Sequence, residues 1–236
     1  MPANRKQPSV WLWYIASIAF LAAGSILGSK AYPNGFDWMY KVMSALASSK
    51  HNPGGGIWFA SGLALGMAAL LPVWITLKRE AATNGTRWEL RWSATLALGI
   101  AGGILVGIER LFIYHISDIL HKAHEALAVL SFLGLYLGTL GIAIERARSR
   151  LDPSNRWTAS IIAGPLIAIG ASQLSLYLDQ RDLGWVDRSW RDMDIPLWLS
   201  FAFWQWLASA AIWLGLGLLL LSQKQANTRR GGESSA

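Results

Sequence analysis

Six long, nearly uncharged apolar runs constrain the fold of this chain more than any other feature. A spanning α-helix needs about 20 mostly apolar residues, because each residue adds about 1.5 Å and a bilayer core is about 30 Å thick. The runs are too long for strands and lack the period-two alternation of a half-buried strand. We therefore predict an all-α, polytopic bundle of six transmembrane helices. The six windows are Val10–Gly28, Ile57–Leu77, Trp92–Tyr114, His124–Ile144, Trp157–Leu178 and Leu197–Ser222.

The composition excludes most other classes of protein. Hydrophobic residues make up 53% of the chain and charged residues 15%, whereas an ordinary globular domain has about 25% charged residues. Most soluble enzymes, disordered tails and collagen-like repeats are therefore excluded. The sequence has no cysteine, which excludes disulfides, thiolate nucleophiles and cysteine-ligated zinc or iron–sulfur sites.

Lysine and arginine predict the orientation of the six spans. One set of segments (the N-terminus, 78–91, 145–156 and the tail) holds 13 of the 21 basic residues, and the opposite set holds 8. Because basic residues favour the cytoplasmic side, both termini are expected to be cytoplasmic, in a bacterial inner (plasma) membrane. This sorting accounts for the net charge of +7 without any nucleic acid. The predicted parts are a cytoplasmic N-terminus (1–9), the transmembrane domain (10–222) and a disordered cytoplasmic tail (223–236).

Glycines recur at intervals of four residues in several spans. Small residues at this spacing let helices approach closely where no hydrophobic effect drives association. The pattern predicts close packing within one bundle or, alternatively, between copies of the chain. The glycines are Gly24/Gly28, Gly62/Gly66, Gly99/Gly103/Gly107 and Gly134/Gly138.

The segment between the first two spans is too long for a simple turn. Apolar residues recur at helical spacing from Trp38 to Leu46, which predicts a short amphipathic helix on the outer leaflet. It is followed by His51-Asn52-Pro53 and three glycines, which release the chain into the second span. The helix is either an interfacial anchor that closes the loop or a lid over a site between the spans.

Histidines and carboxylates gather between the third and fourth spans, on the predicted outer side. Their spacing would let imidazoles and carboxylates hold zinc, form a proton-sharing cluster, or simply supply interfacial polarity. The arrangement is not the His-Glu-x-x-His zinc motif, so no cofactor is expected and zinc is the alternative, with His121, His124 and Asp118 as its candidate ligands. The cluster is His115, Asp118, His121, His124 and Glu125.

Other polar residues are expected to face the same region. A carboxylate at membrane depth is costly unless it is paired or hydrated, so Glu109 and Glu125 are functional candidates. Arg110, next to Glu109, is expected to snorkel towards the interface. The inner halves of the six spans hold no ionisable residue, which argues against ion-coupled transport. We call the predicted site the outer cup: Ser44, His51, Asn52, Glu109, His115, Asp118, His121, His124, Glu125 and Asp179.

Short motifs carry a family resemblance. Tyr32-Pro33-Asn34-Gly35-Phe36-Asp37 is followed by Ser44-Ala45-Leu46-Ala47 and Asn52-Pro53, and His124 opens the fourth span. In these the chain resembles the six-span membrane proteins of the domain-of-unknown-function 998 family and, more distantly, the Frag/DRAM/Sfk group. The usual Ser-x-Leu-Gly of the family ends here in Ala47. The resemblance implies six helices and a family-type outer loop at Ser44, Asn52, Pro53 and His124, and it implies no reaction.

Three functions remain open from the sequence. The leading hypothesis is a non-catalytic membrane protein that contacts lipid, a protein partner or a hydrophobic small molecule through the outer cup. The second is a membrane-embedded, metal-dependent hydrolase or lipid-modifying enzyme that uses the histidine cluster. The third is a transporter of a small hydrophobic solute.

Overall fold

In the part of the chain that the structure describes, six helical segments are long and apolar enough to cross a membrane, which confirms the predicted all-α bundle. The computed structural model describes residues 9–48, 50–113, 120–149, 153–179, 181 and 195–233, and these residues contain no β-strand. The α-helices are α1 (Val10–Lys30), α2 (Met43–Ala47), α3 (Gly56–Ala69), α4 (Leu71–Asn84), α5 (Arg87–Ile108), α6 (Leu120–Ser149), α7 (Pro153–Asp179) and α8 (Phe201–Glu233). A π-helical turn, η1 (Glu109–Ile113), follows α5, and a 3₁₀ turn, η2 (Leu197–Leu199), precedes α8.

Several helices differ in length from the apolar windows. The second span is two helices, α3 and α4, separated at Leu70 just before Pro72. The helix α5 begins at Arg87, ahead of its apolar window, because the side chain of Thr86 caps it and accepts a hydrogen bond from the Glu89 amide at 3.0 Å. The helix α8 continues to Glu233, so the tail expected to be disordered from residue 223 is helical over most of its length. Glutamine, lysine, alanine and arginine there are good helix formers, and they extend a helix that is already nucleated.

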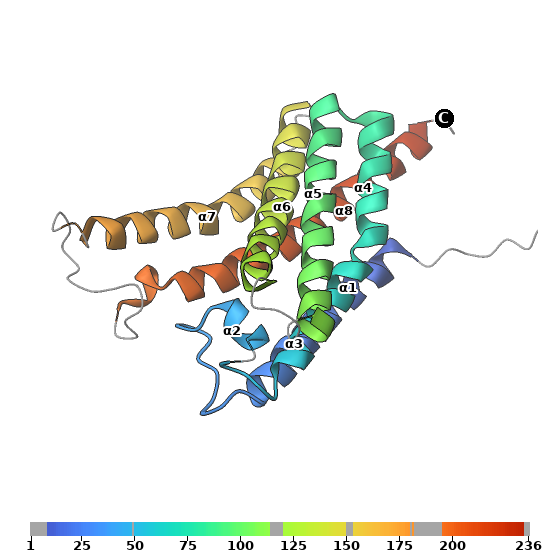
Figure 1. Ribbon diagram of the computed structural model, residues 1–236. Helices are drawn as coiled ribbons and strands as arrows, with labels where there is room; N and C mark the ends of the chain where they lie inside the picture. The colour runs from blue at the N-terminus through green and yellow to red at the C-terminus, as the bar shows by residue number, and fades with distance from the viewer. Residues whose placement is uncertain are drawn as a thin grey trace, which may run out of the picture.

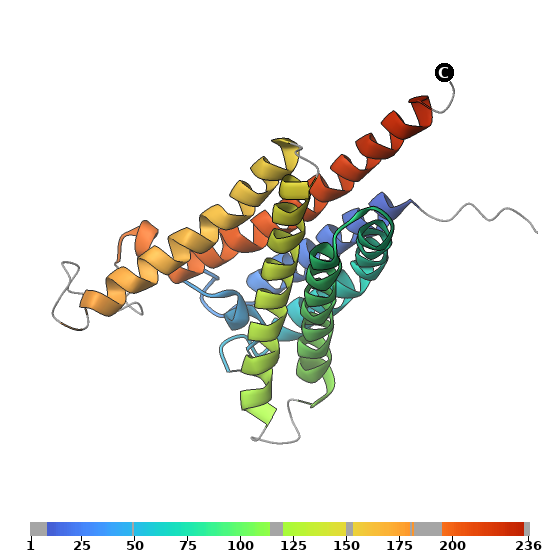
Figure 2. The same cartoon turned by 90° about the horizontal axis from the view of Figure 1, so that it is seen from above.

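Glycines set the two closest helix pairs. A Cβ added at Gly24 of α1 would lie 2.8 Å from the Cα of Gly62 in α3. A Cβ added at Gly99 of α5 would lie 2.6 Å from the carbonyl carbon of Gly134 in α6. These contacts join helices of one chain, so the predicted packing within one bundle is confirmed. The pairs α1–α3 and α5–α6 lie side by side in Figure 1, and α7 runs antiparallel to α8 in Figure 2.

The main hydrophobic core is formed by α4, α5, α6 and α8 with one residue each from α3 and α7, and α1 packs against it. Its largest fully buried side chains include Leu77, Leu96, Tyr136 and Ile212. A smaller core of Leu46, Ala47 and Phe59 fixes α2 against α3. We call the end of the bundle that carries α2 the α2 end (Figure 1).

The helix α2 is shorter than the predicted amphipathic helix, since residues 38–40 form a turn and the helix begins only at Met43. Within this turn, Asp37 accepts a hydrogen bond from the Met39 amide at 2.9 Å. The carbonyls of this turn are bonded by the last span: Ser200 donates to the Met39 carbonyl, and the indole of Trp206 donates to the Lys41 carbonyl at 3.3 Å. These bonds satisfy the backbone of the loop without a longer helix.

Candidate functional site

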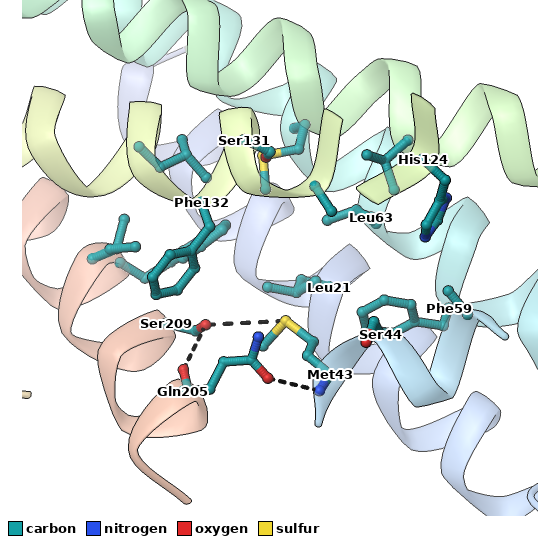
Figure 3. Close-up of a pocket in the computed structure, with 17 residues that line it drawn as sticks. Leu21, Met43, Ser44, Phe59, Leu63, His124, Ser131, Phe132, Gln205 and Ser209 are labelled. Carbon is teal, nitrogen blue, oxygen red and sulfur yellow. Dashed lines mark hydrogen bonds between the residues drawn. The ribbon is translucent and has the colours of Figure 1, made fainter. Parts of the chain in front are cut away.

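A cavity of about 110 Å³ lies beneath α2. Side chains from α1, α2, α3, α5, α6 and α8 line it, and Figure 3 shows α6 on one side of the space and α2 on the other. Most of the lining is apolar, as in Leu21, Phe59, Leu63 and Phe132. We call it the α2 cavity. Its polar lining residues are Ser44, His124, Ser131, Gln205 and Ser209.

The polar groups near α2 are engaged with the protein. Gln205 Oε1 accepts a hydrogen bond from the Met43 amide at 2.9 Å and so holds the first residue of α2 against α8. Ser209 donates to the carbonyl of Gln205 at 2.9 Å, and its hydroxyl lies 4.0 Å from the Met43 sulfur (Figure 3). This part of the cavity therefore offers a guest mainly apolar surface, as small-molecule sites typically do.

A histidine paired with a buried carboxylate forms the polar wall of the cavity. His124 Nδ1 lies 2.7 Å from Glu109 Oε2, and the Glu109 side chain is only 5% exposed. The two atoms share one short hydrogen bond, which occupies Nδ1. That leaves Nε2 as the remaining hydrogen-bonding atom of a ring that lines the cavity. Among the residues that the structure describes, Glu109 Oε1 has no hydrogen-bond partner.

The π-helical turn η1 directs two adjacent side chains to different helices. Glu109 reaches His124 at the start of the fourth span, whereas Arg110 Nε donates to the carbonyl of Ala47, the last residue of α2. Arg110 is 7% exposed, so the prediction that it snorkels is wrong. The carbonyls at a helix end lack partners within the helix, and the guanidinium fills one of these positions. Such π-turns often occur at functional sites.

Asn52 is a structural clamp. Its side chain is fully buried and donates to the carbonyls of Gly28 at 3.0 Å and Leu46 at 2.9 Å. Its Oδ1 accepts from the Gly55 amide at 3.1 Å. One side chain therefore ties together the end of α1, the helix α2 and the start of α3. This network explains why an asparagine precedes Pro53. Asn52 does not line the cavity and instead holds α2 in place beside it.

The structure brings only part of the predicted outer cup together. Ser44 and His124 line the α2 cavity, and Glu109 backs it. His51 and Glu125 are exposed to the surroundings, and Asp179, at the end of α7, is partly buried and does not line the cavity. His115 and Asp118 lie outside the described residues, as does the side chain of His121. Within the described part of the chain, no group of three or more potential metal ligands comes together.

A second buried polar pair, absent from the predicted site, lies at the opposite end of the bundle. Arg146 Nε of α6 lies 2.7 Å from Glu89 Oε1 of α5, and both side chains are 0% exposed. Arg146 Nη1 also donates to the carbonyl of Leu219 in α8 at 3.2 Å. The pair joins three helices. The sequence placed both residues in loops, and only the Thr86 cap next to Glu89 signalled that α5 starts earlier.

The apolar lining residues were not predicted either. Ala128, Phe132 and Trp213 sit in apolar windows, where a cavity-lining residue has the same composition as a lipid-facing or core residue. No protein-family model, curated protein or solved structure matches the chain. The resemblance to the domain-of-unknown-function 998 family therefore stays a prediction.

Proposed function

We propose that this multi-pass membrane protein binds a lipid chain or another small hydrophobic molecule in the α2 cavity. The observation that carries the proposal is an apolar cavity inside a membrane bundle, bordered by a histidine that is paired with a buried carboxylate. Its volume, about 110 Å³, is comparable with an apolar cavity of about 150 Å³ that binds benzene. The cavity is therefore large enough for the end of a hydrocarbon chain or a small ring.

The His124–Glu109 pair supplies the polar contact of this site. Glu109 holds the ring in one orientation through the bond to Nδ1, so Nε2 is presented at a fixed position. A hydroxyl or carbonyl on the guest is the chemistry that one oriented imidazole nitrogen recognises. The bound molecule is thus expected to be amphiphilic, with its apolar part among Phe59, Leu63 and Phe132.

Packing on the far side of the cavity favours binding over passage. Met67 and Leu135 line the cavity and also belong to the main core, whose side chains Leu77 and Leu96 are almost fully buried. A transporter needs a path to both sides of the membrane. A packed core beneath the cavity supports a site that is reached from the α2 end.

The binding test compares two alanines on the same helix. A fatty acid with a photoreactive diazirine at its chain end is incorporated into nanodiscs with the full-length protein, and cross-linked peptides are mapped by mass spectrometry. Ala128 lines the cavity and Ala126 is exposed, so Ala128→Phe fills the site and Ala126→Phe is its matched control. We expect cross-links to Phe132 or Met43 in the native chain and the control, and their loss in Ala128→Phe. Equal labelling of all three proteins contradicts the proposal.

A membrane-embedded lipid-modifying enzyme is the second candidate function, and the His124–Glu109 pair favours it. A histidine oriented by a carboxylate is the usual arrangement of a general base, and Ser44 lines the same cavity. The conservative change His124→Gln separates the two functions. A binding protein keeps cross-linking of the acyl chain in this variant, whereas an enzyme loses turnover of its lipid. Turnover of lipids supplied in nanodiscs, measured by mass spectrometry and abolished in His124→Gln, would move the enzyme to first place.

We also propose that the α2 end faces the outside of a bacterial inner membrane and that both termini are cytoplasmic. The support is the excess of lysine and arginine in the segments at the opposite end, 13 against 8. A phosphatase reporter inserted after Lys50 is expected to be active outside, and a green-fluorescent reporter at the same place to be dark. The reverse pattern overturns the orientation and, with it, the outer position of the site.

A further inference from the structure

A second hollow lies at the end of the bundle opposite α2, between α6 and α7. It is an open groove of about 520 Å³. Three of its lining residues are apolar, Ile144, Ala147 and Ala159, and two are basic, Arg148 and Arg156. The apolar floor and the basic rim of the groove are thus both formed by the last turns of α6 and the first turns of α7.

The two guanidinium groups are accessible to an anion. Arg156 is exposed. Arg148 is 77% exposed, and its Nη1 lies 3.9 Å from Glu145 Oε1; exposed pairs of this kind contribute little free energy. The other carboxylate oxygen of Glu145 already accepts from the Thr86 hydroxyl at 3.2 Å. Arg148 therefore keeps donors that can turn towards a ligand in the groove.

The position of the groove along the spans matches a bilayer interface. The candidate spans run to Ser149 in α6 and from Ser154 in α7, so the groove lies where both helices leave the apolar region. Trp157, next to Arg156, is 71% exposed, and tryptophan is enriched at such interfaces. The start of α7, a helix of 27 residues, adds the positive end of its dipole on the same side.

We propose that this groove binds an anionic phospholipid. The phosphate lies between Arg148 and Arg156, and an acyl chain lies along Ile144, Ala147 and Ala159. Charge complementarity selects the head group, since arginine forms paired hydrogen bonds with phosphate oxygens. The apolar floor selects a lipid over a free anion. Basic sites between transmembrane helices bind lipid head groups in this way, and the site is independent of the α2 cavity.

The test measures lipid affinity on the full-length chain in an uncharged detergent. Native mass spectrometry follows binding of phosphatidylglycerol and of phosphatidylcholine with identical acyl chains. The variant is Arg148→Gln/Arg156→Gln. The matched control, Arg79→Gln/Arg87→Gln, removes the same charge from two other exposed arginines at the same end. Thermal unfolding in phosphatidylcholine shows that each variant is folded, and inorganic phosphate is tested as a separate ligand.

We expect the native chain to prefer phosphatidylglycerol and the double variant to bind it roughly 30-fold more weakly, the effect of two interfacial arginines. Phosphatidylcholine binding and the control stay unchanged. Equal losses in variant and control would show a diffuse charge effect and overturn the proposal. Equal affinity for both lipids would also overturn it, as would inorganic phosphate binding to the groove as tightly as phosphatidylglycerol does.

Discussion

Removing one partner of the buried Glu89–Arg146 pair is expected to destabilise the bundle more than any other single charge removal at this end. Both side chains are 0% exposed and their atoms are 2.7 Å apart. Glu89→Met leaves a guanidinium buried without its carboxylate, and breaking such a pair typically costs about 3–5 kcal/mol. Arg146→Met leaves the carboxylate buried instead, and we expect a loss in the same range.

The double variant Glu89→Met/Arg146→Met is expected to recover most of this loss. Replacing both members of a buried pair by apolar residues is often neutral, because the desolvation of two charges is also removed. The bond from Arg146 to the Leu219 carbonyl also disappears, but the Ser222 hydroxyl still donates to that carbonyl at 3.0 Å. We therefore expect the double variant to lose much less stability than either single variant.

The assay is the free energy of unfolding, obtained by titrating sodium dodecyl sulfate into mixed micelles and following tryptophan fluorescence. The control is Arg148→Gln, whose pair with Glu145 is 3.9 Å long and 77% exposed at the arginine; it should cost about 0–1 kcal/mol. The reasoning is refuted if either single variant matches this control. It is also refuted if the double variant loses as much as the two single losses added together, because the two residues would then be uncoupled.

Three further predictions concern packing, the support of α2 and metal content. Gly24→Leu should destabilise by about 1–3 kcal/mol through overpacking, whereas Gly170→Leu, where an added Cβ meets no atom of another helix within 4 Å, should not destabilise the protein. Asn52→Ala should speed hydrogen exchange in α2 and the start of α3, since three hydrogen bonds are lost; exchange equal to the native rate would contradict the clamp. Elemental analysis of tag-free protein should show no stoichiometric zinc, and zinc that disappears in a folded His121→Ala/His124→Ala variant would reinstate the metal hypothesis.

The six spans could be predicted because the bilayer imposes a length and a composition on each helix. The glycine contacts could also be predicted, because glycines at four-residue spacing in apolar helices indicate close helix packing. The structure shows such contacts between Gly24 and Gly62 and between Gly99 and Gly134. Helix ends were predicted less well. The start of α5 at Arg87 depends on a local threonine cap that the apolar pattern does not show. The extension of α6 to Ser149 depends on a buried ion pair between Glu89 and Arg146, which are far apart in the sequence.

The candidate site was harder to predict, and the reason lies in helix phase. A regular α-helix through Glu109 would fix the direction of its side chain by the 3.6-residue period. The π-turn η1 shifts that period at this residue, so that Glu109 meets His124 while Arg110 meets Ala47. The sequence could name Glu109 and His124 as costly polar groups at the same end of the bundle. Their pairing depends on the direction that η1 gives to the Glu109 side chain and on the residue at which α6 begins. Neither can be recognised from a sequence pattern. A π-turn of this kind is itself a reason to look for function here, because the bundle keeps an irregular backbone and a buried carboxylate beside an apolar cavity.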